Sequence, residues 1–294
     1  MVDILASDYN TLQSRAETLL GAGLGTFGYG QTVQSNAVFQ GNTILASHWD
    51  NLANDIKSIY IHQTGSSPAI RDVAPGDLID DTSADPKINY ANLLTNLEAN
   101  KFDLAPTQSL ITAIDTKTYS SSWNSLVSMT VTATFSTANE ARFFFNSGGK
   151  IRLEGSRTGG SLVAQNDFWS SLLSSVAARD FGADTNPNVN FYTLTNNFQT
   201  YYEEAASSPY ASNRVLLEAK CDVANNATGT ATEVELKLSY IDDYTDPGTP
   251  APGDSVDGTI TVDVTEIKAS GNLQPSGAFT ITSPSFTVSN ISGT

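Results

Sequence analysis

The two histidines are the side chains of this sequence best suited to bind a metal or to transfer a proton, but they lie too far apart to share a metal. His48 and His62 are fourteen positions apart, which places them about 21 Å apart along a single helix. No G-x-S-x-G motif is present, so a serine-hydrolase site is not indicated. The single cysteine, Cys221, has no partner for an internal disulfide. It stands in an alternating apolar row, which predicts a buried core position.

A glycine-rich segment has the spacing of a nucleotide-binding loop. Residues 23–28 read Gly-Leu-Gly-Thr-Phe-Gly, which fits the pattern G-x-G-x-x-G. The dinucleotide fingerprint requires a strand before the glycines and a helix after them. Here a predicted helix precedes them and a polar stretch follows. We therefore interpret residues 21–30 as a set of tight turns, or as a segment that packs against a neighbouring subunit, and we predict no cofactor.

Acidic side chains outnumber basic ones by 31 to 15, which gives a net charge of −16. A protein of this charge repels phosphates, so we expect neither nucleic acid nor an anionic membrane as a partner. One acidic stretch, residues 75–85, offers oxygen ligands to a cation but lacks the glycine and the terminal glutamate of an EF-hand loop. A solvated loop is the better interpretation of its aspartates, which are Asp77, Asp80, Asp81 and Asp85.

Adjacent carboxylates occur as Glu203–Glu204 and Asp242–Asp243. A glycosidase needs two carboxylates on opposite sides of a cleft, which sequence neighbours do not demonstrate. With this many acidic residues, such pairs are expected by chance. We therefore predict neither a catalytic site nor a metal site.

The first elements of secondary structure are predicted from a degenerate repeat in the sequence. Residues 4–12 read Ile-Leu-Ala-Ser-Asp-Tyr-Asn-Thr-Leu, and 40 positions later residues 44–52 read Ile-Leu-Ala-Ser-His-Trp-Asp-Asn-Leu. A weaker third copy follows at residues 88–93. Each copy predicts the start of an amphipathic helix, with Ser7 and Ser47 as N-caps of the first two.

In each copy an aromatic side chain and a leucine three residues later share one helix face. We regard these pairs, together with a tyrosine of the glycine-rich segment, as candidates for docking contacts with other chains. Filling the core of the helical region is the alternative role. The candidates are Tyr9, Leu12, Tyr29, Trp49, Leu52, Tyr90 and Leu93.

The pattern of apolar residues changes further along the chain. A short helix is predicted over residues 107–116, and residues 142–154 are typical of a β-hairpin whose turn is Asn-Ser-Gly-Gly. A helical insert is predicted near residues 165–181. Apolar residues that alternate with polar ones predict strands within residues 127–135, 215–223, 234–240, 260–267 and 279–291.

These elements predict an α+β fold. Residues 1–116 are expected to form a small helical docking region, and residues 117–294 an antiparallel β-sandwich with its helical insert. The start of the sequence lacks the basic and apolar regions of a signal peptide. No apolar run approaches the roughly 20 residues of a membrane span. We therefore expect the protein to be made and used, or assembled, in a cytoplasm.

Two groups of segments resemble a known family. The first group consists of Ser7-Asp8-Tyr9-Asn10, Gly28-Tyr29-Gly30-Gln31 and Ser47-His48-Trp49-Asp50-Asn51-Leu52, and the second is the stretch from Ala141 to Arg152. Both resemble structural virion proteins of tailed bacteriophages, especially marine T4-like phages and related cyanophages. The matching pieces span the first half of the chain and contain no catalytic motif.

The resemblance implies a non-enzymatic component of the virion, assembled in the host cytoplasm. Its partners would be further copies of the chain and other virion proteins. A tail, neck or baseplate protein, or the base of a fibre, is the first hypothesis, and a capsid decoration or head-fibre protein is the second. A third hypothesis is recognition of a host-surface glycan through the aromatic residues Trp123, Trp169, Tyr192, Tyr201, Tyr202 and Tyr210.

Overall fold

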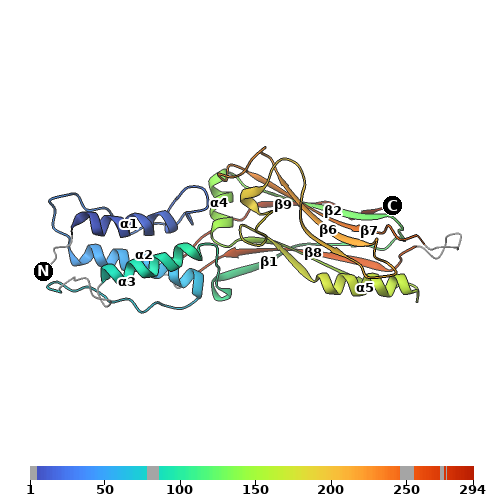
Figure 1. Cartoon of the computed structure of the whole chain (residues 1–294), viewed down its shortest axis with the longest axis horizontal. Coiled ribbons are helices and arrows are strands. Elements are labelled where there is room, and N and C mark those ends of the chain that lie inside the picture. Colours follow the sequence, from blue (N-terminus) through green and yellow to red (C-terminus); the bar gives the residue numbers. More distant parts are fainter. Residues whose placement is uncertain (1–4, 78–85, 246–254, 272–274, 276) are drawn as a thin grey trace. The chain divides into compact units, whose positions relative to one another are not determined.

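A computed structural model of the chain describes residues 5–77, 86–245, 255–271, 275 and 277–294 (Figure 1). It has an α+β fold with a small N-terminal helical region and two packed antiparallel sheets, as the sequence predicts. The helices are α1 (Ala6–Leu20), α2 (Ala46–Thr64), α3 (Pro86–Ala99), α4 (Ala138–Asn146) and α5 (Ala164–Val176). Two short 3₁₀ turns lie at Pro106–Gln108 and Phe191–Thr193.

The chain forms two compact units. Unit 1 contains residues 1–110, 139–149 and 268–283, and unit 2 contains the rest. The sequence did not predict that two later segments return to complete the helical unit. Their return has a structural role, since helix α4 and the extended segment that ends at residue 283 supply much of the packing around the glycine-rich loop.

The three long helices of unit 1 pack side by side and run in the same direction (Figure 1). Near their starts, Tyr9 contacts Trp49, which in turn contacts Tyr90. Near their ends, the Gln63 side chain of α2 donates to the Leu97 carbonyl of α3, at 3.0 Å. Because parallel neighbours require the chain to travel back between them, α1 and α2 are each followed by a long return segment. This explains the 40-residue period of the first two copies.

The repeated aromatic positions converge in the core of unit 1. The rings of Tyr9 and Trp49 meet edge-to-face at 5.4 Å, and those of Trp49 and Tyr90 at 5.8 Å. The three side chains are at most 2% exposed. Edge-to-face contacts of this kind add to the stabilisation that burial alone provides.

The helix starts differ from the prediction. The N-cap residues are Leu5 and Leu45, so Ser7 and Ser47 lie inside the first turn and are not caps. The N–H group of each N-cap residue donates instead to the side chain of the third residue of its helix. Asp8 accepts from the Leu5 N–H, and Nδ1 of His48 accepts from the Leu45 N–H at 3.1 Å. This is the backward half of a capping box.

The return segment between α1 and α2 has no strand as a partner. Carbonyls at the end of α1 accept from Tyr29 and Gln31, and side chains satisfy other parts of its backbone. Asn10 of α1 accepts from the Val38 N–H and donates to its carbonyl, at 2.8 and 2.9 Å. Asp55 of α2 accepts from the N–H groups of Gln34 and Ser35, at 2.9 and 2.8 Å. Burial raises the pKa of Asp55, and these hydrogen bonds oppose that rise.

Unit 2 is a β-sandwich. One sheet has the strand order β1-β8-β3-β4, and the other has the order β10-β2-β7-β6-β5, with β9 also paired to β2. The strands are β1 (Ser109–Tyr119), β2 (Leu126–Thr134), β3 (Lys150–Thr158), β4 (Ala178–Phe181), β5 (Gln199–Ala205), β6 (Arg214–Cys221), β7 (Glu233–Ile241), β8 (Thr259–Ala269), β9 (Ser285–Val288) and β10 (Ser292–Gly293).

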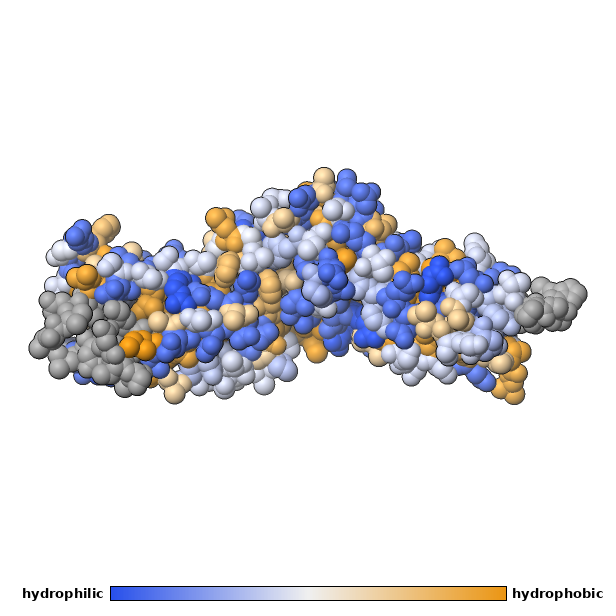
Figure 2. Space-filling model, in the orientation of Figure 1, coloured by the Kyte–Doolittle hydropathy of each residue, from blue (hydrophilic) through white to orange (hydrophobic). Residues whose placement is uncertain are grey.

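Alternating burial along β2, β6, β7 and β8 matches the predicted strands. Val131, Leu217, Leu236 and Val262 are among the side chains that fill the core between the sheets, each no more than 1% exposed. Cys221 is buried as well, which confirms the core position predicted for it. On the face drawn in Figure 2, hydrophobic residues are scattered among hydrophilic ones.

Three local predictions are wrong, and a fourth is right only in part. Residues 109–116 belong to strand β1, where a helix was predicted, and residues 142–145, predicted as the first strand of a hairpin, belong to helix α4. Residues 279–281 belong to no strand, although Phe279 and Ile281 are buried in alternation. The insert predicted near 165–181 is helical only as far as Val176, because its last four residues form β4.

We predict that Asp55→Ala lowers the free energy of unfolding by about 1–3 kcal/mol, because it leaves two backbone N–H groups without their acceptor. Asp50→Ala, at an exposed position of the same helix, is the matched control and should change stability much less. Urea denaturation followed by tryptophan fluorescence measures both. Equal losses for the two variants would contradict the role given to Asp55.

Candidate functional site

Most of the predicted docking residues are buried inside unit 1. Tyr9, Leu12, Tyr29, Trp49, Leu52 and Tyr90 are between 0% and 4% exposed, and Leu93 is half-buried. They therefore fill the core of the unit, which is the alternative role that the sequence allowed. Tyr29 also lines the groove described below.

The glycine-rich loop is held by two polar side chains of helix α4. The guanidinium of Arg142 donates to the carbonyls of Ala22 and Gly23, at 2.8 and 3.0 Å, and also to those of Gly25 and Phe27. The side-chain amide of Asn146 donates to the carbonyls of Gly25, Phe27 and Gly28. The loop therefore presents its carbonyl oxygens to donors of its own chain. A phosphate loop instead directs N–H groups at its ligand.

Four glycines of this loop have positive φ angles, and one of them, Gly30, also lies in close contact with a side chain of α4. Its φ is +69°, and a Cβ there would overlap the ring of Phe143. The ring therefore lies directly against the backbone of the loop. Arg142 and Phe143, adjacent in α4, hold two successive parts of the glycine-rich segment.

Behind the loop lies a buried aromatic stack. The ring of His62 is parallel to that of Phe279 at 4.3 Å and also contacts Tyr29 at 4.8 Å. Burial lowers the pKa of His62 to about 3. The hydroxyl of Tyr29 donates to the carbonyl of Lys101 at 2.6 Å and accepts from the Gln63 amide. This stack joins the segment around Phe279 to the ends of helices α1 and α2.

A groove of about 220 Å³ opens beside this stack. Its walls come from the three parts of unit 1. Tyr29 and Gly30 end the glycine-rich loop, Glu140 and Phe143 belong to α4, and the returning segment supplies residues 280–282. It combines a carboxylate, an aromatic ring and an extended backbone, which are groups that bind peptides. We take it as the candidate docking site.

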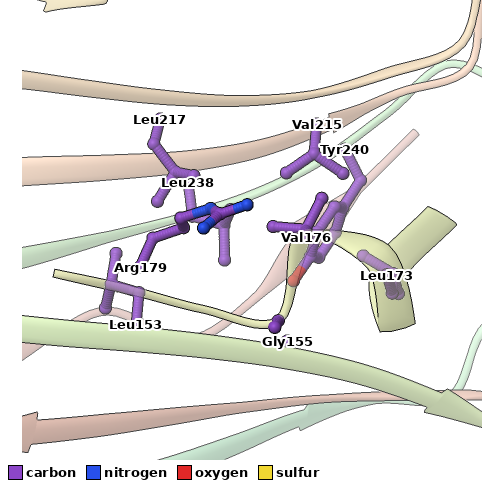
Figure 3. Close-up of a pocket in the computed structure, with 10 residues that line it drawn as sticks. Leu153, Gly155, Leu173, Val176, Arg179, Val215, Leu217, Leu238 and Tyr240 are labelled. Carbon is purple, nitrogen blue, oxygen red and sulfur yellow. The ribbon is translucent and has the colours of Figure 1, made fainter. Parts of the chain in front are cut away.

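Unit 2 contains a second, much smaller space between its sheets (Figure 3). Its volume is about 10 Å³, enough for about one water molecule. Aliphatic side chains of β3, β6, β7 and α5 form most of the wall. The hydroxyl of Tyr240 points toward Gly155, and the Arg179 side chain reaches in from β4.

Two polar atoms at this space are buried without a hydrogen-bond partner in the part of the chain described, namely Nε of Arg179 and the Tyr240 hydroxyl. The other end of the guanidinium donates to the Tyr202 hydroxyl at 2.6 Å and stacks on that ring at 4.0 Å. Ala177, at the rim, has a φ of +52°, a conformation that non-glycine residues rarely adopt. One ordered water suits this space, whereas a substrate does not fit.

The other sequence candidates do not assemble into a site. Trp123, Trp169, Tyr192 and Tyr201 are at most 7% exposed, so among the glycan candidates only Tyr202 and Tyr210 are partly accessible. Within the ranges that the structure describes, no three His, Cys, Asp or Glu side chains gather as metal ligands. Asp77 accepts from the Ala74 N–H. The other members of the predicted acidic loop, Asp80, Asp81 and Asp85, lie outside the described residues.

Sequence reasoning missed Glu140, Phe143 and the segment 280–282 as parts of one site. Residues 142–145 had been assigned to a hairpin, which hides the helix face that carries Glu140 and Phe143. The alternation of Phe279 and Ile281 was noticed but was attributed to a strand. No local pattern in the sequence marks these residues as parts of one site.

Comparisons of the chain with known protein families, with curated protein sequences and with solved structures found no match. None of the helices that the structure describes is long and apolar enough to cross a membrane.

We predict that the buried His62 makes unit 1 sensitive to acid. An unfolded histidine has a pKa of about 6.5, so the unfolded state gains a proton below that pH while the native state stays neutral down to about pH 3. Native stability attributable to this residue is therefore complete above pH 6.5 and falls as the pH drops. The loss between pH 7.5 and pH 5 should be about 2 kcal/mol.

The test compares the wild type with His62→Phe, which retains a flat ring against Phe279. Urea unfolding at both pH values, in a Trp123→Phe, Trp169→Phe background, leaves Trp49 as the reporter of unit 1. The pH-dependent loss should shrink in the variant. An identical loss in both proteins would assign the acid sensitivity to other groups.

We predict that Gly155→Ala destabilises unit 2 by about 1–3 kcal/mol, because the new Cβ would overlap the Tyr240 hydroxyl. Tyr240→Phe removes that hydroxyl, so the two substitutions should be coupled by about 1 kcal/mol in a double-mutant cycle. Tyr201→Phe alters another buried tyrosine and is the control, which should combine additively with Gly155→Ala. Additivity with both phenylalanine variants would refute the contact.

Proposed function

We propose that the protein is a non-enzymatic structural component of a tailed-bacteriophage virion, associated with the tail, neck or baseplate or forming the base of a fibre. It is assembled in the host cytoplasm through contacts with copies of itself and with other virion proteins. In this proposal unit 1 docks to the particle, and unit 2 projects or contributes contacts between copies.

The observation that carries the proposal is that the segments resembling phage virion proteins meet in unit 1, apart from residues 150–152, which begin strand β3 of unit 2. Tyr9 contacts Trp49, and Arg142 holds the turn that leads to Gly28. Segments that are more than a hundred positions apart in the sequence thus form a single packed surface and support a shared structural role. None of them brings catalytic groups together.

Two further features support a role in assembly. The docking groove of unit 1 lies among extended segments that side chains hold in place, so a partner need not order them on binding, and ordering costs affinity. In unit 2, the edge strand β1 has no buried side chain along its eleven residues. An edge strand of this length offers unpaired backbone groups to another chain.

The proposal predicts a fixed number of copies of the chain per particle. Particles from a lysate of the producing host would be purified on a density gradient and analysed by quantitative mass spectrometry. Immunogold labelling with antibodies against residues 150–267 would then place the chain on the particle. Label at the tail or neck is expected.

Label on the head would instead support the decoration or head-fibre alternative. Complete absence of the chain from purified particles, with abundant chain in the unassembled fraction, would overturn the proposal. A known tail protein of the same particles serves as the positive control for recovery.

A further inference from the structure

The wall of the groove contains a strand-like segment that has no strand beside it. Phe279 and Ile281 are each 4% exposed, whereas Thr280 and Thr282 are exposed. This period of two is the pattern of a half-buried β-strand. Yet the segment belongs to neither sheet.

Side chains take the place of a neighbouring strand along the first part of this segment. The Gln31 side-chain amide accepts from the Thr280 N–H and donates to the Thr280 carbonyl, both at 3.0 Å. Nζ of Lys268 donates to the Ile281 carbonyl at 3.2 Å. The segment is therefore fixed in an extended conformation before any partner arrives.

Beyond that point the pairing stops. In the described part of the chain, the backbone N–H and carbonyl of Thr282 have no hydrogen-bond partner. Both groups belong to a residue that lines the groove. Extended backbone with free donors and acceptors, beside a groove, is the arrangement that accepts an added strand.

The part of the groove formed by helix α4 determines which side chain of a partner fits. Glu140 supplies a carboxylate and Phe143 an aromatic ring. A carboxylate accepts up to about four hydrogen bonds, so Glu140 can receive a new cation in addition to its existing contacts. An ammonium or guanidinium group is also attracted to the face of an aromatic ring.

We propose that this groove binds an extended segment of a partner protein, which pairs with Thr282 as an added strand and inserts a lysine or arginine between Glu140 and Phe143. The net charge of −16 favours a basic partner for the whole chain. This inference rests on the proposed function only in taking the partner to be another virion protein, since the recognition itself depends on the groove alone.

The first test uses the full chain and two synthetic probes, acetyl-Thr-Val-Lys-Val-Thr-amide and its counterpart with glutamate at the centre. Amide shifts in two-dimensional NMR spectra are followed during titration. The lysine peptide should shift Gly30 and Thr280 to Thr282, and the glutamate peptide should bind at least about threefold more weakly. Equal binding of the two peptides, or shifts confined to other residues, would overturn the proposal.

Two controls separate the charge contact from the backbone contact. Glu140→Gln should weaken the lysine peptide by about three- to fivefold, the effect of one partly exposed ion pair, while Glu154→Gln at an exposed position of unit 2 should have no effect. A lysine peptide methylated on its central backbone nitrogens should lose most of its binding. Unchanged affinity after methylation would exclude strand addition.

Failure of this inference and failure of the proposed function give different results. If the chain is found in particles but no peptide shifts the groove residues, only the groove assignment fails. If the lysine peptide binds as expected but particles lack the chain, the groove remains a peptide site and the virion assignment fails.

Discussion

A buried backbone N–H or carbonyl must find a hydrogen-bond partner, and this requirement governs the helical unit. Its return segments have no neighbouring strand, so carbonyls at the helix ends and, above all, side chains provide the partners. Asn10 and Gln31 each pair with one backbone residue as a neighbouring strand would, while Asp55 and Arg142 satisfy backbone donors and acceptors respectively. Without these side chains, the parallel arrangement of helices would leave long stretches of chain unsatisfied.

The same requirement produces the docking groove. Gln31 fixes Thr280, and Phe143 lies against Gly30, so the walls are rigid although they come from distant parts of the sequence. The side-chain partners end before Thr282, and the chain there keeps free backbone groups. Stability of the unit and availability for a partner therefore follow from one feature, the point at which internal pairing ends. In unit 2, ordinary strand ladders satisfy the backbone instead.

Sequence patterns predicted the parts whose burial is periodic and local. The repeat located the three parallel helices through Tyr9, Trp49 and Tyr90, and alternation located β2, β6, β7 and β8. The failures have identifiable causes. Consecutive phenylalanines at 143–145 favour a strand by propensity, but tertiary packing on two sides makes the segment helical. Strand β1 has no buried face, so its sequence lacks the alternation of apolar and polar residues that predicts a strand. Its partner β8 lies far away in the sequence. The groove joins three such distant segments, which no local pattern reveals.

The division of unit 1 into three stretches of sequence has a consequence for synthesis. The helices leave the ribosome first, but the side chain that holds the glycine-rich loop arrives with residue 142, and the last wall of the groove arrives only with residues 280–282. The chain must therefore be synthesised as far as residue 282 before the groove can be complete. A chain that stops before residue 280 therefore lacks one wall of the groove, and under the proposed function it would lack part of its docking site.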